Sequence, residues 1–303
     1  MNNQPAAPLL EDLKLFCAVV RKQSFAATAL ELGVSKAFVS KRIAVLEQAL
    51  GVRLLHRTTR RLALTDHGTL AHQWAQRIRE DVDQLTDAIS QKGSSPRGLL
   101  RLCTSSGFGR NRVAAAISAL ALEYPELEVQ LELLDRPVDL IGEGFHLDIR
   151  IGQVQEPHLI ARRIAANQRV LCASPAYLER NGTPRELAEL ARHRCIVIRE
   201  RDQDVGGWKL SGPAGEETVR VSGPLSTNNG ELVHQWAIDG HGIILRSIWD
   251  VGRSLADGSL VRVLPEYHQQ ADVWAIYPTR LGMVANVRVC VQFLEAWLAA
   301  PAA

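Results

Sequence analysis

The residues with the most specific chemistry are the basic side chains between Ser35 and Arg61. Seven lysines and arginines lie there against one acid, Glu47. Lysine and arginine neutralise the phosphates of a DNA backbone, and side chains near a helix N-terminus contact base edges. The segment therefore predicts a DNA-binding surface. Its candidate contacts are Ser35, Lys36, Ala37, Ser40, Lys41 and Arg42 on a reading helix, and Arg57, Thr58, Arg60 and Arg61 on a basic hairpin.

A second set of polar groups suits the binding of a small anion such as a carboxylate. Two clusters, 104–106 and 226–229, each follow a predicted strand and precede a predicted helix. Hydroxyls and free N–H groups at a helix N-terminus bind anions, although the same residues could serve only as helix caps. The candidate effector ligands are Thr104, Ser105, Ser106, Thr227 and Asn228, and Arg150, Arg199 and Arg246 near strand ends are either further anion partners or ordinary ion-pair residues.

Local signals define the helices that position the basic residues. Ser24 and Ser35 are predicted N-caps of two short helices, and Gly33 ends the first of them. The second helix has one apolar stripe, and a preceding helix supplies another that would pack beneath it. The stripes consist of Val39, Ile43, Leu46 and Leu50 in the second helix, and of Leu9, Leu13, Phe16, Val19 and Val20 in the preceding one.

A long helix is predicted from Asp66 to about Gln91, with Thr65 as its cap. Its apolar residues repeat at three- or four-residue spacing, close to a heptad seam. The stripe packs either on its own domain or on a second copy of the helix. Few residues precede the helix to cover it, so the dimer is favoured. The seam consists of Ala71, Trp74, Ile78, Val82, Leu85 and Ile89.

The segment 91–98 breaks all periodicity and predicts a linker. Beyond it, short apolar runs alternate with helical segments, which favours an α/β fold with largely parallel strands in two lobes. Predicted strands are 99–103, 129–134, 147–151, 159–164, 170–173, 195–198, 219–221, 242–245 and 272–277; predicted helices are 110–123, 138–143, 184–191, 230–239, 248–256 and 284–298.

Charge and composition limit the other classes of protein. Residues 1–91 hold 12 lysines and arginines against nine acids, whereas the net charge of the whole chain is only +2. Basic charge confined to one region disfavours a nonspecific nucleoid protein. The sequence has no G-x-S-x-G elbow, P-loop or H-E-x-x-H motif, and Gly107-Phe108-Gly109 lacks the third glycine of a dinucleotide fingerprint, so no enzyme, cofactor or metal is expected.

The five cysteines and the apolar segments predict a reduced, cytoplasmic protein. The cysteines are scattered without zinc-ligand spacing, which favours buried thiols over redox sensors such as Cys103 or Cys172. No signal peptide is evident, and the longest uncharged apolar run, 113–122, is too short to span a bilayer.

The N-terminal segment closely resembles the winged-helix head of LysR-type transcriptional regulators, and the resemblance continues along the whole chain. Phe38 departs from it, because the family commonly has alanine there; the larger ring either alters base contacts or packs under the helix. The matching residues are Phe16, Ser24, Phe25, Ala27, Ala29, Leu32, the V-S-x-x-x-V-S run 34–40, Arg42, Ile43, Leu46, Glu47, Leu50, Gly51, Leu54, Leu55, Arg57, Thr58, Leu64, Thr65 and Gly68.

The resemblance implies an α+β chain in four parts. These are a winged helix-turn-helix at 1–65, a dimerisation helix at 66–91, a hinge at 92–97 and an effector-binding domain at 98–303 with the fold of periplasmic binding proteins. Lobe one would comprise 98–166 and 270–303, and lobe two 167–269. The resemblance also implies that the chain crosses between the lobes twice, near 165–169 and near 265–270. The implied partners are a double-stranded DNA operator, a small-molecule effector, RNA polymerase and further copies in a homodimer or homotetramer. A small-molecule-binding protein with no specific DNA target is the alternative function.

Two sequence runs, in the reading helix and in the hairpin, indicate a subset of this family. The runs K-A-F-V-S-K-R-I and H-R-T-T-R-R-L-A-L-T are similar to those of regulators of small hydroxy-dicarboxylate metabolism. This similarity implies a small hydroxylated organic acid as the effector.

Overall fold

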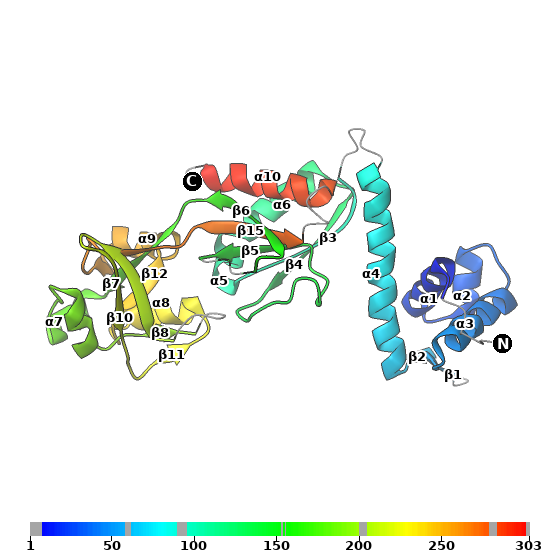
Figure 1. Ribbon diagram of the computed structural model, residues 1–303, viewed down its shortest axis with the longest axis horizontal. Coiled ribbons are helices and arrows are strands. Elements are labelled where there is room, and N and C mark those ends of the chain that lie inside the picture. Colours follow the sequence, from blue (N-terminus) through cyan, green and yellow to red (C-terminus); the bar gives the residue numbers. More distant parts are fainter. Residues whose placement is uncertain are drawn as a thin grey trace. The chain divides into compact units, whose positions relative to one another are not determined.

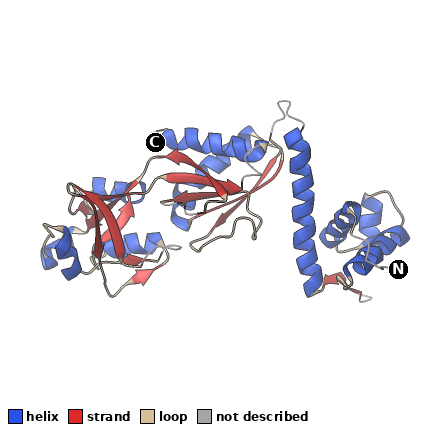
Figure 2. Ribbon diagram, in the orientation of Figure 1, coloured by secondary structure: helices blue, strands red, loops and turns tan. Residues whose placement is uncertain are grey.

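The computed structural model describes residues 8–57, 62–89, 96–152, 154, 156–199, 205–278 and 284–300. The chain divides into two compact units, residues 1–94 and 95–303. Figure 1 labels their helices and strands, and Figure 2 distinguishes helices from strands by colour.

The first unit begins with the three helices that the local signals predict. The Ser24 hydroxyl accepts a hydrogen bond from Ala27 N–H, and the Ser35 hydroxyl accepts one from Phe38 N–H, so both predicted caps are confirmed. Gly33 adopts a left-handed φ of +65° in the turn between the second and third helices, which favours glycine there. The helices are α1 (Leu10–Lys22), α2 (Phe25–Glu31) and α3 (Lys36–Leu50).

The core of this unit contains most of the two predicted stripes. Leu50 and Leu9 are exceptions, because both side chains are exposed. Leu50 is the last residue of α3 and Leu9 lies just before α1, so neither position is covered by a neighbouring helix. The buried members are Leu13, Phe16, Val19, Val39, Ile43 and Leu46.

The predicted hairpin follows α3. Strand β1 (Leu55–Arg57) pairs antiparallel with β2 (Leu62–Leu64). The Glu47 carboxylate accepts hydrogen bonds from the N–H groups of Leu54 and Leu55, at 2.9 and 3.3 Å. The one acid of the basic segment therefore fixes the start of the hairpin to the reading helix. Thr58, Arg60 and Arg61 lie outside the described residues, as does the side chain of Arg57.

Lobe one contains a five-stranded sheet in the order β4-β3-β5-β15-β6. β3 runs parallel to β4 and β5, whereas β15 is antiparallel to β5 and β6. The strands are β3 (Gly98–Thr104), β4 (Leu127–Leu133), β5 (Leu147–Ile151), β6 (Leu159–Ala165) and β15 (Val273–Pro278).

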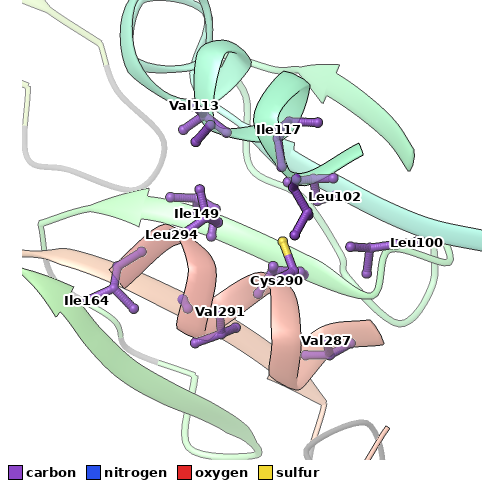
Figure 3. Close-up of a cluster of buried hydrophobic side chains, with 14 of the residues drawn as sticks. Leu100, Leu102, Val113, Ile117, Ile149, Ile164, Val287, Cys290, Val291 and Leu294 are labelled. Atoms are coloured by element: carbon purple, nitrogen blue, oxygen red, sulfur yellow. The ribbon is translucent and has the colours of Figure 1, made fainter. Parts of the chain in front are cut away.

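Helices pack on one face of this sheet and bury its main core. A continuous helical run consists of α5 (Ser106–Phe108), a π-helical turn η1 (Gly109–Val113) and α6 (Ala114–Glu123), and α10 (Ala285–Ala299) packs beside it. Figure 3 shows Cys290 of α10 directed toward Leu102 of β3, and Leu294 of the same helix beside Ile149 of β5.

The helix predicted at 138–143 is wrong, because the chain forms turns at 140–144. The Asp139 carboxylate accepts the N–H of Gly142, and Glu143 pairs with Arg136 and also accepts the N–H of Asp139. These side chains satisfy backbone donors locally and so compete with helical hydrogen bonds. Gly144 then adopts a φ of +73°.

Lobe two contains a six-stranded sheet whose pairs are all antiparallel, which corrects the predicted parallel arrangement. β9 and β10 form a hairpin around Pro213 and Ala214, and β8 and β11 pair in parallel apart from this sheet. The main path is β10-β9-β14-β7-β12, with β13 paired to β7. The strands are β7 (Gln168–Ala173), β8 (Val197–Ile198), β9 (Gly207–Gly212), β10 (Gly215–Arg220), β11 (Ser226–Thr227), β12 (Ile244–Ser247), β13 (Val261–Arg262) and β14 (His268–Gln270).

The helices of lobe two agree with the prediction except near residue 184. A helix that was not predicted, α7, follows β7, and the segment predicted as a helix at 184–191 forms a short 3₁₀ helix, η2. A lone 3₁₀ turn has too few residues to show a helical apolar period. The helices are α7 (Pro175–Asn181), η2 (Leu187–Arg192), α8 (Gly230–Ile238) and α9 (Ile248–Ala256).

Two adjacent segments connect the lobes. The first is 166–167 and the second is 271–272, slightly later than predicted because β14 still belongs to the sheet of lobe two. Asn167 N–H donates to the Asp272 carboxylate at 3.1 Å, and Ala271 N–H donates to the Asn167 carbonyl at 3.0 Å. The two crossings are therefore bonded to each other.

Candidate functional site

The first turn of α3 presents a mixed basic and apolar surface. Lys36, Ala37, Phe38 and Lys41 are exposed, and Ser40 is half-buried. Ser35 is exposed too, but its hydroxyl already accepts the capping hydrogen bond from Phe38 N–H. Because the N-terminal residues of a reading helix contact base edges, this turn has the position and charge of a DNA-reading surface.

Arg42 forms an ion pair that its position in the sequence does not predict. Its guanidinium lies 2.5 Å from the Asp12 carboxylate of α1, and Asp12 is only 2% exposed. This pair joins α1 to α3. A contact between Arg42 and a base stays a prediction.

The long helix α4 (Asp66–Ile89) has an apolar stripe that is only partly covered. The predicted cap is confirmed, since Gly68 N–H donates to the Thr65 hydroxyl at 2.9 Å. Ala71 and the fully buried Ala75 pack into the core of the first unit. Trp74, Ile78 and Leu85 of the same stripe remain exposed at 55, 38 and 58%. The packing on its own domain is thus seen for the alanines, and the pairing with a second copy stays a prediction for the exposed residues.

In the second unit, one carboxylate joins the helix N-termini of the two lobes. Asp135, just after β4, accepts a hydrogen bond from Ser106 N–H at 2.8 Å through one oxygen. Its other oxygen accepts one from Asn229 Nδ2 of lobe two, at 3.1 Å. Ser106 begins the helical run of lobe one, and Asn229 precedes α8. These groups therefore already hold a carboxylate between the lobes.

Two further contacts join the lobes beside Asp135. Arg110 and Glu231 form an ion pair at 2.7 Å. The rings of Phe108 and Trp249 lie 4.7 Å apart between centroids. The indole N–H of Trp249 is buried and has no hydrogen-bond partner among the described residues.

The structure distinguishes the three predicted ligands of lobe one. Thr104 is fully buried, and its hydroxyl donates to the Ile149 carbonyl at 2.7 Å, so it joins β3 to β5 and is not available to a ligand. Ser105 is half-buried, and its hydroxyl makes no capping hydrogen bond. Ser106 contributes its backbone N–H. Ser105 and Ser106 thus remain candidates.

In lobe two, the residue that caps α8 is Asn229 rather than Asn228. The Asn229 side chain accepts the N–H groups of Glu231 and Leu232, both at 3.1 Å. Thr227 is buried and its hydroxyl accepts Asn229 N–H. Asn228 is exposed. The predicted ligand was Asn228, whereas the residue that contacts the other lobe is its neighbour Asn229.

The three candidate arginines differ in their environment. Arg150 pairs with the buried Asp148 at 3.0 Å and with Glu156 at 2.7 Å. Arg246 pairs with Asp250 at 2.7 Å and is buried, while Arg199 is exposed beside residues that are not described. Arg150 and Arg246 are therefore ion-pair residues in this conformation.

The pairing of Arg246 also affects Asp250. Burial acts to raise the pKa of Asp250, but the hydrogen bond from His234 and the charge of Arg246 outweigh burial and hold this pKa below its ordinary value. A side chain at Gly230 would have its Cβ 2.1 Å from the Arg246 guanidinium. Glycine at the first residue of α8 is thus required by the arginine packed against it.

A hollow of about 620 Å³ lies at the edge of the lobe-one sheet where β5 ends and β15 begins. Its lining includes the carboxylates of Glu156 and Asp272, and these pair with Arg150 and Arg163. Two carboxylates on its wall disfavour an anion in direct contact with them. The donors around Asp135 are the better place for an anionic group.

Asp135 and Asn229 are the residues that sequence reasoning missed or ranked too low. A signal for Asp135 was present, because it follows a strand as Ser105 does. β3 and β4 are parallel and pair Thr104 with Leu133, so both strands end at the same edge of the sheet. Nothing local distinguished Asn228 from Asn229.

All five cysteines are buried, and burial raises the pKa of Cys172, Cys195 and Cys290 to about 12. Since the ordinary value is 9.0, the thiolate fraction of each should fall about a thousandfold near pH 8. We expect iodoacetamide to leave these three thiols unmodified in the native protein, as measured by peptide mass spectrometry. The same protein in denaturant should react fully, and rapid native alkylation of Cys172 would contradict the buried position.

The arrangement defines a class of protein: a helix-turn-helix head with a basic reading surface, joined by a long helix to a two-lobed α/β unit with polar donors between its lobes. The chain belongs to the LysR family of bacterial transcriptional regulators. The lysR helix-turn-helix model matches residues 10–69, and the LysR substrate binding domain model matches residues 93–299. The protein is therefore a DNA-binding transcriptional regulator with an effector-binding domain, and not an enzyme.

Known proteins resemble it over nearly its whole length. The chain is 53% identical to the HTH-type transcriptional regulator DmlR of Escherichia coli K12 over 99% of this chain and 96% of that one. It is 45% identical to the transcriptional activator TtdR of the same strain, over 96% and 94%.

Solved structures of the family have the same fold. CrgA of Neisseria meningitidis gives a TM-score of 0.61 at 27% identity, covering 96% of this chain and 99% of that one. Full-length AphB of Vibrio cholerae gives 0.59 at 26% identity, covering 95% and 99%. No helix in the described part of the chain is long and apolar enough to cross a membrane.

Proposed function

We propose that this regulator senses a small organic anion bound between its two lobes, at the donors that now hold Asp135. The observation that carries the proposal is the pair of hydrogen bonds from Ser106 N–H and Asn229 Nδ2 to one carboxylate. Donors from opposite lobes that hold one carboxylate have the geometry to hold another. Charge-assisted hydrogen bonds of this kind are short and strong.

The effector class that suits this site is a small hydroxy-dicarboxylate. One carboxylate would take the place of Asp135, and the Ser105 hydroxyl beside it is a further donor. The similarity of the reading helix and hairpin to regulators of hydroxy-dicarboxylate metabolism supports the same class. The effector would therefore compete with the Asp135 side chain for the two helix N-termini.

The test compares two adjacent asparagines. Asn229→Asp keeps an acceptor for the α8 cap but replaces the Nδ2 donor by a negative charge beside Asp135, so the affinity for malate or tartrate should fall by about tenfold or more. Asn228→Ala, at an exposed position, is the matched control and should bind as wild type does. Isothermal titration calorimetry measures both, with the corresponding diamides as neutral control ligands.

Asp135→Ala should change the affinity for the anion in the opposite direction. Because it removes the competing carboxylate and leaves Ser106 N–H and Asn229 Nδ2 unoccupied, it should raise the affinity for the same anion. Weaker binding in Asp135→Ala, or equal affinities in Asn229→Asp and Asn228→Ala, would place the effector elsewhere.

The same proposal includes how binding reaches DNA. The regulator acts as a homodimer or homotetramer whose paired heads contact half-sites about 34 Å apart, or a multiple of that spacing. An effector that displaces Asp135 changes the contacts between the lobes, and this change alters the spacing of the heads, the bend of the DNA and access for RNA polymerase. The exposed face of α4 supports the dimer.

A further inference from the structure

Phe38 is the largest side chain exposed on the reading helix. It lies in the first turn of α3 and is 47% exposed. The next residue, Val39, is fully buried, and its side chain packs beneath the helix in the core of the first unit. Of the two alternatives that the sequence left open, packing under the helix is therefore excluded. The ring of Phe38 is therefore accessible to a partner of the reading helix, and its burial against one would be favourable.

The surroundings of Phe38 identify the chemistry of that partner. Lys36 and Lys41 are exposed on either side of it in the sequence, and both suit phosphates. Arg42, the longest basic side chain of the same helical face, is instead paired with Asp12. The first turn thus combines cationic groups with one aromatic ring and lacks the bidentate base contact that an unpaired arginine would provide.

One group in the major groove matches such a ring. The C5 methyl of thymine is the apolar feature of that groove, and the other base edges present hydrogen-bond donors and acceptors. A phenylalanine ring cannot form base-edge hydrogen bonds, but it can bury a methyl group. Lys36 and Lys41 would hold the adjacent phosphates while the ring contacts the base.

We propose that Phe38 is a specificity-determining residue that recognises thymine by packing its ring on the C5 methyl group in the major groove. Each half-site of the operator then contains at least one thymine that this side chain reads. This assignment adds a residue and a base to the DNA-binding activity of the family. It is independent of the effector proposed above, because it concerns only the first unit.

The experiment begins by selecting a binding site from a randomised duplex library with the full-length wild-type protein. The selected duplex is then synthesised with uracil in place of thymine at one position at a time, which removes only the methyl group. Fluorescence anisotropy should show that one or two uracil positions per half-site weaken wild-type binding by about fourfold each, the factor expected for one buried methyl.

The variant Phe38→Ala should bind the thymine duplex more weakly and should no longer distinguish thymine from uracil at those positions. Phe38→Leu should retain part of the discrimination. Leu30→Ala is the matched control, since Leu30 is an exposed apolar residue in α2, and it should discriminate as wild type does. Binding of all variants to a thymine-free inosine–cytosine duplex should remain at the wild-type level, which verifies that the head is folded.

Three results would overturn the proposal. Wild-type protein could show no position at which uracil weakens binding. Phe38→Ala could keep the wild-type preference for thymine over uracil. It could also weaken binding to the thymine-free duplex by the same factor, which would assign the ring to the fold of the head or to a protein partner.

Discussion

Replacing Ile78 by glutamate should dissociate the proposed dimer and lower operator affinity by on the order of a hundredfold or more. Ile78 is 38% exposed and shares its face of α4 with Trp74 and Leu85. In a helix pair, this glutamate would be desolvated opposite its own copy. Two linked heads bind DNA with an avidity that separate heads lose. Sedimentation velocity and operator titration measure the two effects.

Gln76→Glu is the control for this substitution. Gln76 is exposed on the opposite side of the same helix, so it receives the same charge without entering the apolar face. It should remain associated and bind the operator normally. If Ile78→Glu and Gln76→Glu have the same oligomeric state and the same operator affinity, Trp74, Ile78 and Leu85 do not form the dimer contact.

Replacing Arg42 by alanine should destabilise the head by about 3 kcal/mol, the lower end of the cost of leaving a buried charge unpaired. Asp12 would lose its guanidinium partner while only 2% exposed. The lower end applies because the Arg42 side chain is itself 28% exposed and partly hydrated. Hydrogen exchange of peptides from α1 and α3, measured in the full-length protein, should accelerate roughly a hundredfold.

Two variants separate this structural role from base reading. Asp12→Asn combined with Arg42→Gln replaces the ion pair by two neutral amides and should recover most of the lost protection. Lys41→Ala, at an exposed neighbouring position, should leave exchange unchanged and weaken binding to DNA of any sequence. Normal exchange in Arg42→Ala together with a changed base preference would return Arg42 to the reading surface.

The head could be predicted closely because its signals are local. A serine or threonine cap acts on N–H groups three residues away, and Ser24, Ser35 and Thr65 all do so. The same locality explains why the ion pair of Arg42 was not predicted. Its partner lies 30 positions earlier in another helix, and helical periodicity describes only the side of α3 on which the residue lies.

The α4 helix shows a second limit of periodicity. A three- and four-residue repeat predicts an apolar stripe, but it does not specify which partner covers each position. Ala71 and Ala75 pack on the head because α1 lies against them, whereas Trp74, Ile78 and Leu85 remain exposed. Which positions of the stripe are covered depends on where α1 is placed.

Strand direction in lobe two was wrong for a related reason. An apolar run predicts a strand, whereas its direction depends on the connections to strands far away in the chain. β7 pairs with β12, β13 and β14, which begin more than 70 residues later, and all three are antiparallel to it. The alternation of strands and helices therefore indicated the α/β class without the pairing.

By itself the sequence determined the family, the caps, the order of most elements and the presence of donors at two helix N-termini, because each depends on residues close together in the chain. Only the tertiary structure decided that Asp135 lies between Ser106 and Asn229, that Thr104 and Arg150 are occupied within lobe one, and that Phe38 is exposed while Arg42 is paired. These outcomes depend on distances between segments that the chain brings together only on folding, and a hydrogen bond or ion pair forms only where such a distance closes to about 3 Å.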